Sequence, residues 1–143
     1  MNRRDDFQVG LYEWQDCSAP ASFIRELVFV QEQGVSQEEE MDGRDDSCVH
    51  ALAMLGDTAV ATGRLLPSGS IGRMAVLKAY RGCGVGGLVL EALVEAARLK
   101  GYAEVSLAAQ EHALQFYRNH NFVAEGDRFM EAGIPHFRMR RQL

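Results

Sequence analysis

A glycine-rich segment in the middle of the chain constrains the fold more than any other feature. Tyr80-Arg81-Gly82-Cys83-Gly84-Val85-Gly86-Gly87 places four glycines within six residues, directly before an apolar stripe at helical spacing. Glycine permits positive φ and a close approach of the backbone to a ligand. The start of a helix offers unpaired N–H groups and the positive end of the helix dipole. The segment therefore predicts an anion-binding loop suited to a pyrophosphate, to which Arg81 adds a positive charge.

Two classes of phosphate-binding loop fit this segment poorly. A loop for nucleoside triphosphates ends in Gly-Lys-Ser or Gly-Lys-Thr, whereas Gly86 is followed here by Gly87 and Leu88. A dinucleotide pattern is literally present as Gly82, Gly84 and Gly87. However, four residues separate it from the predicted strand, and no acidic residue ends the next strand. Binding of NAD or NADP stays open as an alternative, and so does a glycine turn that only permits tight packing.

The chain as a whole predicts a mixed α/β (α+β) fold in a single domain, residues 1–143. Strands are expected at 7–14, 48–55, 59–66, 71–77, 105–107, 122–129 and 137–141, and helices at 21–34, 84–100 and 112–120. Gly56-Asp57 marks a hairpin turn, so the middle strands are antiparallel. The strand at 105–107 follows a strand–helix unit and is expected to run parallel to 71–77. The prediction is a mostly antiparallel sheet with helices on both faces.

The first helix and the acidic run after it carry separate predictions. The helix is expected to bury Phe23, Leu27 and Val30, with Ser18 or Ser22 as its cap. The acidic run, 38–46, is expected to form a loop with one helical turn. One hypothesis is that it attracts a cationic amine; the other, which we favour, is that it is a solvated segment that aids solubility.

Composition excludes several functional classes. A net charge of −5 argues against the basic face that a general nucleic-acid binder needs. No apolar run approaches the ~20 residues that span a bilayer, and the charged N-terminus has no secretory pattern. Cys17, Cys48 and Cys83 form no disulfide pattern and fit a reducing compartment. We therefore expect a cytoplasmic protein without nucleic-acid or membrane partners.

Several stretches resemble the GNAT superfamily of N-acetyltransferases, and together they cover nearly the whole chain. Arg81-x-x-Gly84-x-Gly86, after the strand Met74-Ala75-Val76-Leu77, is similar to the family's pyrophosphate loop for coenzyme A. The segment Gln110–Phe122 is similar to its second signature, a helix that carries Ala and Tyr. The segments 24–35 and 131–136 are similar to a branch of small bacterial members. Three positions depart from the family pattern: Lys78, Gln110 and Asn121.

The resemblance implies a sheet that splits between the strands at 71–77 and 105–107, with the pantetheine arm of coenzyme A filling the split. It implies acetyl-CoA as co-substrate, an amine of a small molecule or peptide as acceptor, no metal, and compatibility with a homodimer. The alternative is a non-catalytic, coenzyme A-binding regulatory module of the same fold. The residues expected to contact the cofactor are Met74, Ala75, Val76, Arg81, Gly82, Cys83, Gly84, Val85, Gly86, Gly87, Gln110 and Tyr117.

The implied reaction is direct acetyl transfer to a primary amine. The N–H of Val76 is expected to stabilise the oxyanion of the tetrahedral intermediate. Tyr117 is expected to act as general acid on the leaving sulfur, and the alternative is that it is a core aromatic residue. A lysine-like amine, with a pKa of ~10.4, is mostly protonated at neutral pH and needs a base. Strand 71–77 contains no carboxylate that could act as this base. The candidate bases are therefore His112, His136 and the acids at 38–40, among which we name Glu39.

Overall fold

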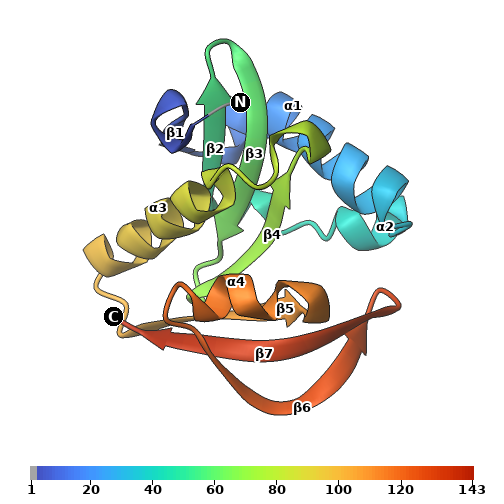
Figure 1. Cartoon of the computed structure of the whole chain (residues 1–143), viewed down its shortest axis with the longest axis vertical. Helices are drawn as coiled ribbons and strands as arrows, with labels where there is room; N and C mark the ends of the chain where they lie inside the picture. The colour runs from blue at the N-terminus through green and yellow to red at the C-terminus, as the bar shows by residue number, and fades with distance from the viewer. Residues whose placement is uncertain (1–2) are drawn as a thin grey trace.

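Seven strands form one sheet in the computed structural model, which describes residues 3–143 (Figure 1). The strands are β1 (Gln8–Tyr12), β2 (Val49–Leu55), β3 (Thr58–Leu65), β4 (Ser70–Val76), β5 (Glu104–Gln110), β6 (Val123–Glu131) and β7 (Ile134–Gln142). The helices are α1 (Trp14–Arg25), which continues as a π-helical segment (Glu26–Glu32), α2 (Gln37–Glu40), α3 (Val85–Leu99) and α4 (Leu114–Arg118). Short 3₁₀ turns lie at Arg4–Asp6, Asp45–Ser47, Lys78–Tyr80 and Glu111–Ala113.

The sheet is mixed and mostly antiparallel, as the sequence predicts. Its strand order is β1-β2-β3-β4-β5-β7-β6. Within residues 3–143, β4 and β5 form the one parallel pair, joined through α3, and the remaining pairs are antiparallel. The expected hairpin between β2 and β3 turns at Gly56, whose φ is 59°. No helix in this part of the chain is both long and apolar enough to cross a membrane.

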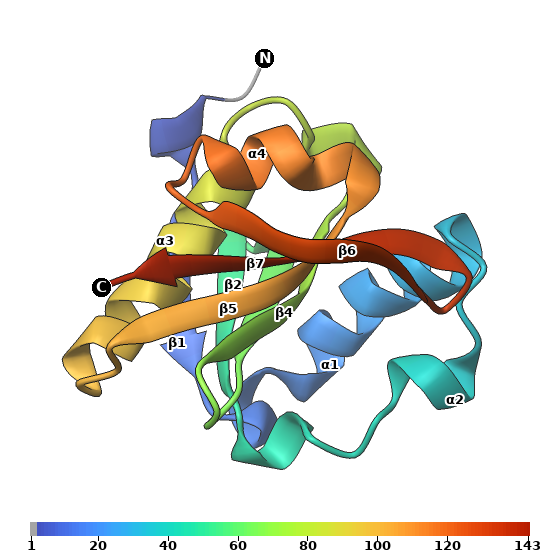
Figure 2. The same ribbon diagram turned by 90° about the horizontal axis from the view of Figure 1, so that it is seen from below.

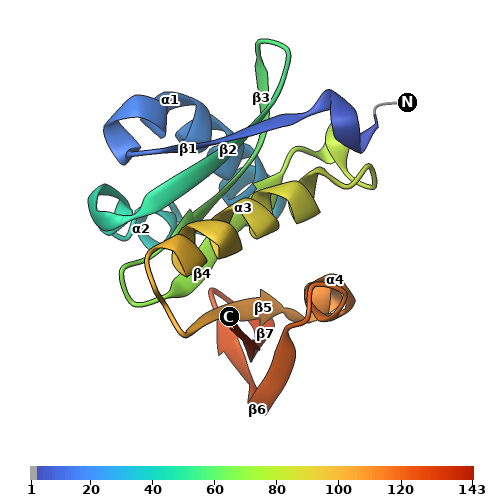
Figure 3. The same ribbon diagram turned by 90° about the vertical axis from the view of Figure 1, so that its left-hand side faces the viewer.

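Helices cover both faces of the sheet, which confirms the predicted layering (Figure 3). The stripe predicted for α3 faces the larger hydrophobic core, with Val85, Val89 and Leu93 fully buried. On the opposite face, α1 packs a smaller cluster against β2 and β4. These two layers hold β4 from both sides and leave its C-terminal end beside the glycine loop.

The prediction for the first helix was wrong at its start and on its buried face. α1 begins at Trp14 rather than at residue 21, and its N-cap is Glu13, with no side-chain cap bond. Pro20 lies inside the helix, a position that sequence rules treat as a break. The buried side chains are Cys17, Ala21, Ile24 and Val28, whereas Phe23 is 61% exposed. The small residues Cys17 and Ala21 let the helix approach the sheet closely. The helix therefore buries the face that carries them, and not the face that carries Phe23.

β4 and β5 separate soon after they meet. Their pairing is confined to Ser70 with Ser106 and Ile71 with Leu107, although both strands continue for several residues. Figure 3 shows β5, β7 and β6 leaving the plane of the first four strands. The family resemblance implied this split, and the described residues contain it. We call this opening the β4–β5 split.

The acidic run is a loop with one helical turn, α2, as predicted, and most of its residues are exposed, but Glu40 and Asp45 are buried. Ser36 caps α2 by accepting a hydrogen bond from the N–H of Glu39. Glu40 and Asp45 are both 5% exposed and bind the buried guanidinium of Arg25, which is 1% exposed. These ion pairs, together with that of Asp45 to Arg64, connect the run to α1 and β3, a structural role that neither hypothesis included. We call the interacting residues the arginine–carboxylate cluster: Arg25, Arg64, Glu40, Asp42 and Asp45.

Arg64 is the second arginine of this cluster. Its Nη1 donates to Asp45 Oδ1 at 2.9 Å and to Asp42 Oδ1 at 3.0 Å. A ring of Trp14 lies over the other arginine, with 5.3 Å from the ring centre to Arg25 Cζ. Buried charges are tolerated only when paired and hydrogen-bonded. Each charge of the cluster has a partner of opposite sign, and Nε of Arg64 is the one nitrogen of its two guanidinium groups that is buried without a hydrogen bond within residues 3–143.

Replacing Arg25 with Met tests how much the fold depends on the cluster. Arg25→Met leaves two buried carboxylates short of their cation, so we expect the free energy of unfolding to fall by about 3–5 kcal/mol. Arg98→Met is the control, because Arg98 pairs with Glu95 on the surface and such pairs contribute about 0–1 kcal/mol. Urea denaturation of both variants gives the comparison. Equal losses would show that the buried cluster stabilises no more than a surface pair.

Candidate functional site

The glycine loop presents free N–H groups at the start of α3. Gly82 and Gly84 have φ values of 82° and 88°, in the left-handed region that favours glycine. Gly84 is the N-cap of α3 and provides no side chain to accept a hydrogen bond. The first helical bond runs from Leu88 N–H to Gly84 C=O at 3.3 Å, so the three N–H groups before it have no partner within the helix. Unpartnered N–H groups at a helix start are suited to an anion.

The second signature helix packs directly on this loop. A Cβ placed on Gly87 would lie 3.0 Å from His120 Nε2, and one on Gly86 would lie 3.6 Å from the ring of Phe116. Both side chains come from the helical segment after β5. Glycine at these two positions therefore lets α4 and its C-terminal extension approach the start of α3. The fold brings the two sequence motifs into contact.

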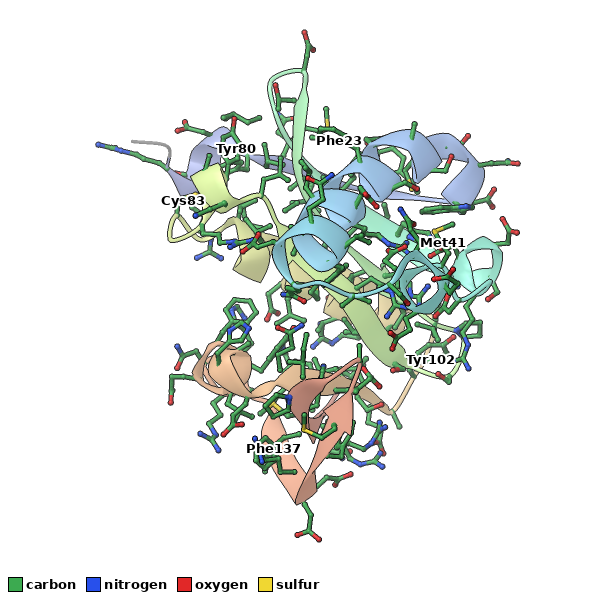
Figure 4. All side chains as sticks on the ribbon, turned by 90° about the vertical axis from the view of Figure 1, so that its right-hand side faces the viewer. Phe23, Met41, Tyr80, Cys83, Tyr102 and Phe137 are labelled. Carbon is green, nitrogen blue, oxygen red and sulfur yellow. The ribbon has the colours of Figure 1, made fainter. Side chains whose placement is uncertain are left out.

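Cys83 lies inside the loop and is half-buried. Its thiol donates to the carbonyl of Tyr80 at 2.8 Å. Figure 4 shows both residues on one side of the molecule, away from Met41 in the acidic run. The glycine loop and the acidic run thus lie on opposite sides of β4.

The backbone of β4 alternates between β3 and the split. The N–H of Leu77 donates to Val60 C=O at 2.9 Å, so Leu77 faces β3. Because successive residues of a strand direct their N–H and C=O groups to opposite sides, those of Val76 and Met74 face away from β3. Beyond Ile71, β5 pairs with none of them. Val76 therefore directs its N–H toward the split.

The side chain of Arg81 reaches β4 and the π-helical segment. Its Nε donates to Val76 C=O at 2.9 Å, and its two terminal nitrogens bind the Glu32 carboxylate at 2.6 and 2.8 Å. The hydrogen bonds from Arg81 lower the pKa of Glu32. In this conformation the guanidinium is held by a carboxylate and a carbonyl. Its predicted contact with a pyrophosphate stays a prediction.

Sequence reasoning missed a distortion in the middle of β4. Arg73 has a φ of 50°, which is rare for a residue other than glycine, and the β3–β4 register shifts beside it. Its guanidinium donates to the carbonyls of Glu39 and Glu40 at 3.0 and 3.1 Å, and to Asp42 Oδ2 at 3.4 Å. These bonds hold the strained residue in place. The neighbouring Gly72 is the one feature of the local sequence that indicates an irregular strand here.

Tyr117 is nine-tenths buried on α4. Its ring packs edge-on against Phe116 and Phe122, with ring centres 5.0 and 5.9 Å apart. Burial raises the pKa of Tyr117 to about 12. Its hydroxyl makes no hydrogen bond to any residue in 3–143. The side chain is part of the core, as the alternative held, and its hydroxyl nevertheless keeps a proton to give.

Two of the predicted candidate bases, His112 and His136, lie next to Gln110 at the end of β5. It exchanges two hydrogen bonds with Gln33, at 2.9 and 3.3 Å. Its Oε1 also accepts from His112 Nε2 at 2.7 Å. His136 lies directly opposite Gln110 on β7. Glu39 stays apart, because its carboxylate accepts from the hydroxyl of Ser36 on α2.

Comparison with known proteins identifies the family. The model of the acetyltransferase (GNAT) domain matches residues 22–143. The chain belongs to the GNAT acetyltransferase family. It is 39% identical over 123 residues to the uncharacterized N-acetyltransferase YjcF of Bacillus subtilis, covering 83% of this chain and 88% of that protein. The GNAT fold is also that of a solved Lactobacillus plantarum structure, with a TM-score of 0.89, 30% identity and 99% coverage of both chains.

A more distant GNAT structure shares the fold. It is a GNAT family acetyltransferase from Elizabethkingia anophelis with acetyl-CoA bound, with a TM-score of 0.76, 17% identity, and coverage of 98% of this chain and 100% of that one. At this identity the likeness concerns the fold alone. Membership in the GNAT family supports acyl transfer and coenzyme A binding. It therefore favours an enzyme over a regulatory module and coenzyme A over a dinucleotide.

The GNAT chain uses half of the carboxylates in its acidic run for internal ion pairs. Those of Glu40, Asp42 and Asp45 are bound by arginines, whereas Glu38, Glu39 and Asp46 remain exposed. The hydrogen bond from Arg64 lowers the pKa of Asp42 well below its usual range. At Asp45, burial alone would raise the pKa, but Arg25 and Arg64 together lower it. Asp42 and Asp45 are therefore charged throughout the physiological range and are neutralised by their partners.

The depressed pKa of Asp42 predicts how stability depends on pH. Its contribution is complete above the unfolded value of ~3.9 and is lost as pH falls toward the lower folded value. Asp42→Asn should therefore lower the free energy of unfolding at pH 7 by roughly 1.5–3 kcal/mol and flatten its decline between pH ~5 and ~2. The exposed Asp46 provides a control in the same run, as Asp46→Asn. Urea titrations at several pH values test this, and parallel curves for Asp42→Asn and the wild type would contradict it.

Proposed function

We propose that this protein transfers an acetyl group from acetyl-CoA to a primary amine. The observation that carries the proposal is the pairing of an anion site with an open strand edge. The unpartnered N–H groups after Gly84 suit the pyrophosphate. The outward backbone groups of Met74 suit an amide of the pantetheine arm. One molecule of coenzyme A carries both the pyrophosphate and this amide, and a GNAT structure of the same fold was solved with acetyl-CoA bound.

The residues of the split supply the stabilisation that acyl transfer needs. When the amine attacks the thioester carbon, negative charge develops on the carbonyl oxygen. The N–H of Val76 faces the split and is a preorganised donor for that charge. The strained backbone at Arg73, three residues earlier, fixes the path of β4 at this point. We assign Val76 the oxyanion contact.

Tyr117 is the proposed proton donor to the leaving group. The C–S bond breaks as the tetrahedral intermediate collapses, and the thiolate needs a proton or a hydrogen bond. A hydroxyl whose pKa is raised to about 12 by burial is protonated at every physiological pH. It therefore acts first as a hydrogen-bond donor to sulfur, and the proton follows as negative charge grows there.

Acetyl-CoA binding is the first test of the proposed function. Titration calorimetry with the purified protein should give micromolar binding of acetyl-CoA, with NAD and ATP as controls that do not bind. Gly84→Val places a branched side chain at a φ of 88°, a conformation that valine rarely adopts, so the affinity should fall by about tenfold or more. Gly101→Val, at the far end of α3 with a φ of 83°, controls for backbone strain alone. Binding of NAD in place of acetyl-CoA would overturn the loop assignment.

Tyr117→Phe tests the donor without disturbing the core. The ring and its aromatic contacts remain, and only the hydroxyl is lost. We expect kcat for amine acetylation to fall by about 10²-fold or more, while the dissociation constant of acetyl-CoA changes little. Release of free thiol, followed against a panel of a polyamine, an aminoglycoside and a lysine peptide, gives kcat. An unchanged kcat would reduce Tyr117 to a core aromatic residue.

A further inference from the structure

The β5–β7 register places a histidine one strand away from the β4–β5 split. Gln110 lies three residues beyond Leu107, the last residue of β5 that pairs with β4. His136 is its direct partner on β7, and side chains of such partners share a face with Cβ atoms about 5 Å apart. In Figures 1 and 2 the turn between β6 and β7 lies on the same side of the molecule as the end of the π-helical segment. Because β4 and β5 are parallel, Gln110 and the C-terminal end of β4 both lie at the open end of the split.

The hydrogen bonding of His136 fixes which ring nitrogen carries the proton. Nδ1 lies 2.7 Å from the carbonyl oxygen of Ile134. A carbonyl only accepts, so Nδ1 is the donor. In the neutral ring Nε2 is then an unprotonated acceptor. The ring stacks on Phe129, with centres 5.8 Å apart and planes at 25°, and its side chain is 7% exposed. The orientation of the ring is thus set from two sides.

A carboxylate stands ready to stabilise the protonated ring. Glu131 Oε2 lies 3.7 Å from His136 Nε2. Among residues 3–143, Glu131 is the one acidic group within 4 Å of this ring, and Gln110 on the neighbouring strand is uncharged. Glu131 is largely exposed, so it can move as a substrate enters. A proton taken up at Nε2 therefore meets a negative charge.

The other histidines are less suited to take a proton at the split. His112 is exposed, and its Nε2 donates a hydrogen bond to the side-chain oxygen of Gln110, so this nitrogen is not free to accept a proton. His50 donates to the carbonyl of Asp45 inside the arginine–carboxylate cluster, and burial lowers its pKa. His120 donates to Glu91 on the helix layer, against the start of α3. His136 alone among the four combines a fixed tautomer, burial beside the split and a nearby carboxylate.

We propose that Nε2 of His136 is the general base of the reaction, taking the proton of the acceptor amine directly or through one water. This rests on the proposed function. The ammonium gives one proton to Nε2, and its freed electron pair forms the C–N bond at the thioester carbon. The C–S bond then breaks with its electron pair on sulfur, which receives a proton from Tyr117. A second proton leaves the nitrogen and restores the one that Tyr117 gave, and His136 returns its own proton to solvent.

The experiment compares the pH dependence of kcat/KM in His136→Asn and His112→Asn. Asparagine keeps an N–H for the Ile134 carbonyl and lacks the basic nitrogen. At pH 7 the His136 variant should lose about 10²–10⁴-fold in kcat/KM. The loss should shrink as pH rises toward the pKa of the amine itself, because the free amine then needs no base. His112→Asn should keep the wild-type profile. A merely structural role for His136 would give a loss that does not depend on pH, and this would overturn the proposal.

Two further readouts keep the proposal separate from folding and from the proposed function. Acetyl-CoA binding to His136→Asn, measured by calorimetry, should match the wild type, which shows that the variant is folded. NMR of the imidazole nitrogens in the wild-type protein should find that the neutral ring of His136 carries its proton on Nδ1. A neutral ring with its proton on Nε2 would overturn the assignment without any variant. If the wild type binds acetyl-CoA but acetylates no amine, the proposed function fails and the role of His136 falls with it.

Discussion

The separation of β4 from β5 is the constraint on which the rest of the structure depends. A strand edge inside a sheet leaves N–H and C=O groups that require partners. Here the N–H of Val76 and the backbone groups of Met74 lie beside a helix start with unpartnered N–H groups. Two kinds of unsatisfied backbone donor, at one end of one gap, suit a ligand that carries both phosphates and amides. The loop, the strand and the packing of α4 on Gly86 and Gly87 serve that arrangement.

The arginine–carboxylate cluster supports β4 from the side opposite the glycine loop. Three carboxylates and the guanidinium groups of Arg25, Arg64 and Arg73 cancel one another, and Arg73 connects the cluster to β4. The acidic run thereby shapes the strand that is proposed to bind the thioester. The exposed carboxylates of Glu38, Glu39 and Asp46 are not paired with arginines. The run therefore carries less unpaired negative charge than its composition indicates.

Sequence patterns predicted the elements that depend on residues close together in the chain. The glycine loop, the apolar stripe of α3 and the turn at Gly56 each reflect neighbours a few residues apart. The cluster joins Arg25 to residues 15 and 20 positions away, and Gln33 meets Gln110 across 77 positions. The spacing of apolar residues along the sequence does not indicate contacts between residues so far apart. The strained Arg73 and the helical Pro20 went unpredicted for the same reason, because tertiary contacts hold conformations that local propensity disfavours.

The sheet also separates the two proton-transfer roles that the reaction needs. Tyr117 packs with Ala109 in the larger core, whereas Gln110 and His136 face the opposite side of the same strands. A group whose pKa lies near 12 retains its proton and serves as donor. A neutral imidazole with a free Nε2 accepts one. In the proposed reaction the thioester lies between the separated strands, with its sulfur toward Tyr117 on one face and its carbonyl carbon toward the amine and His136 on the other.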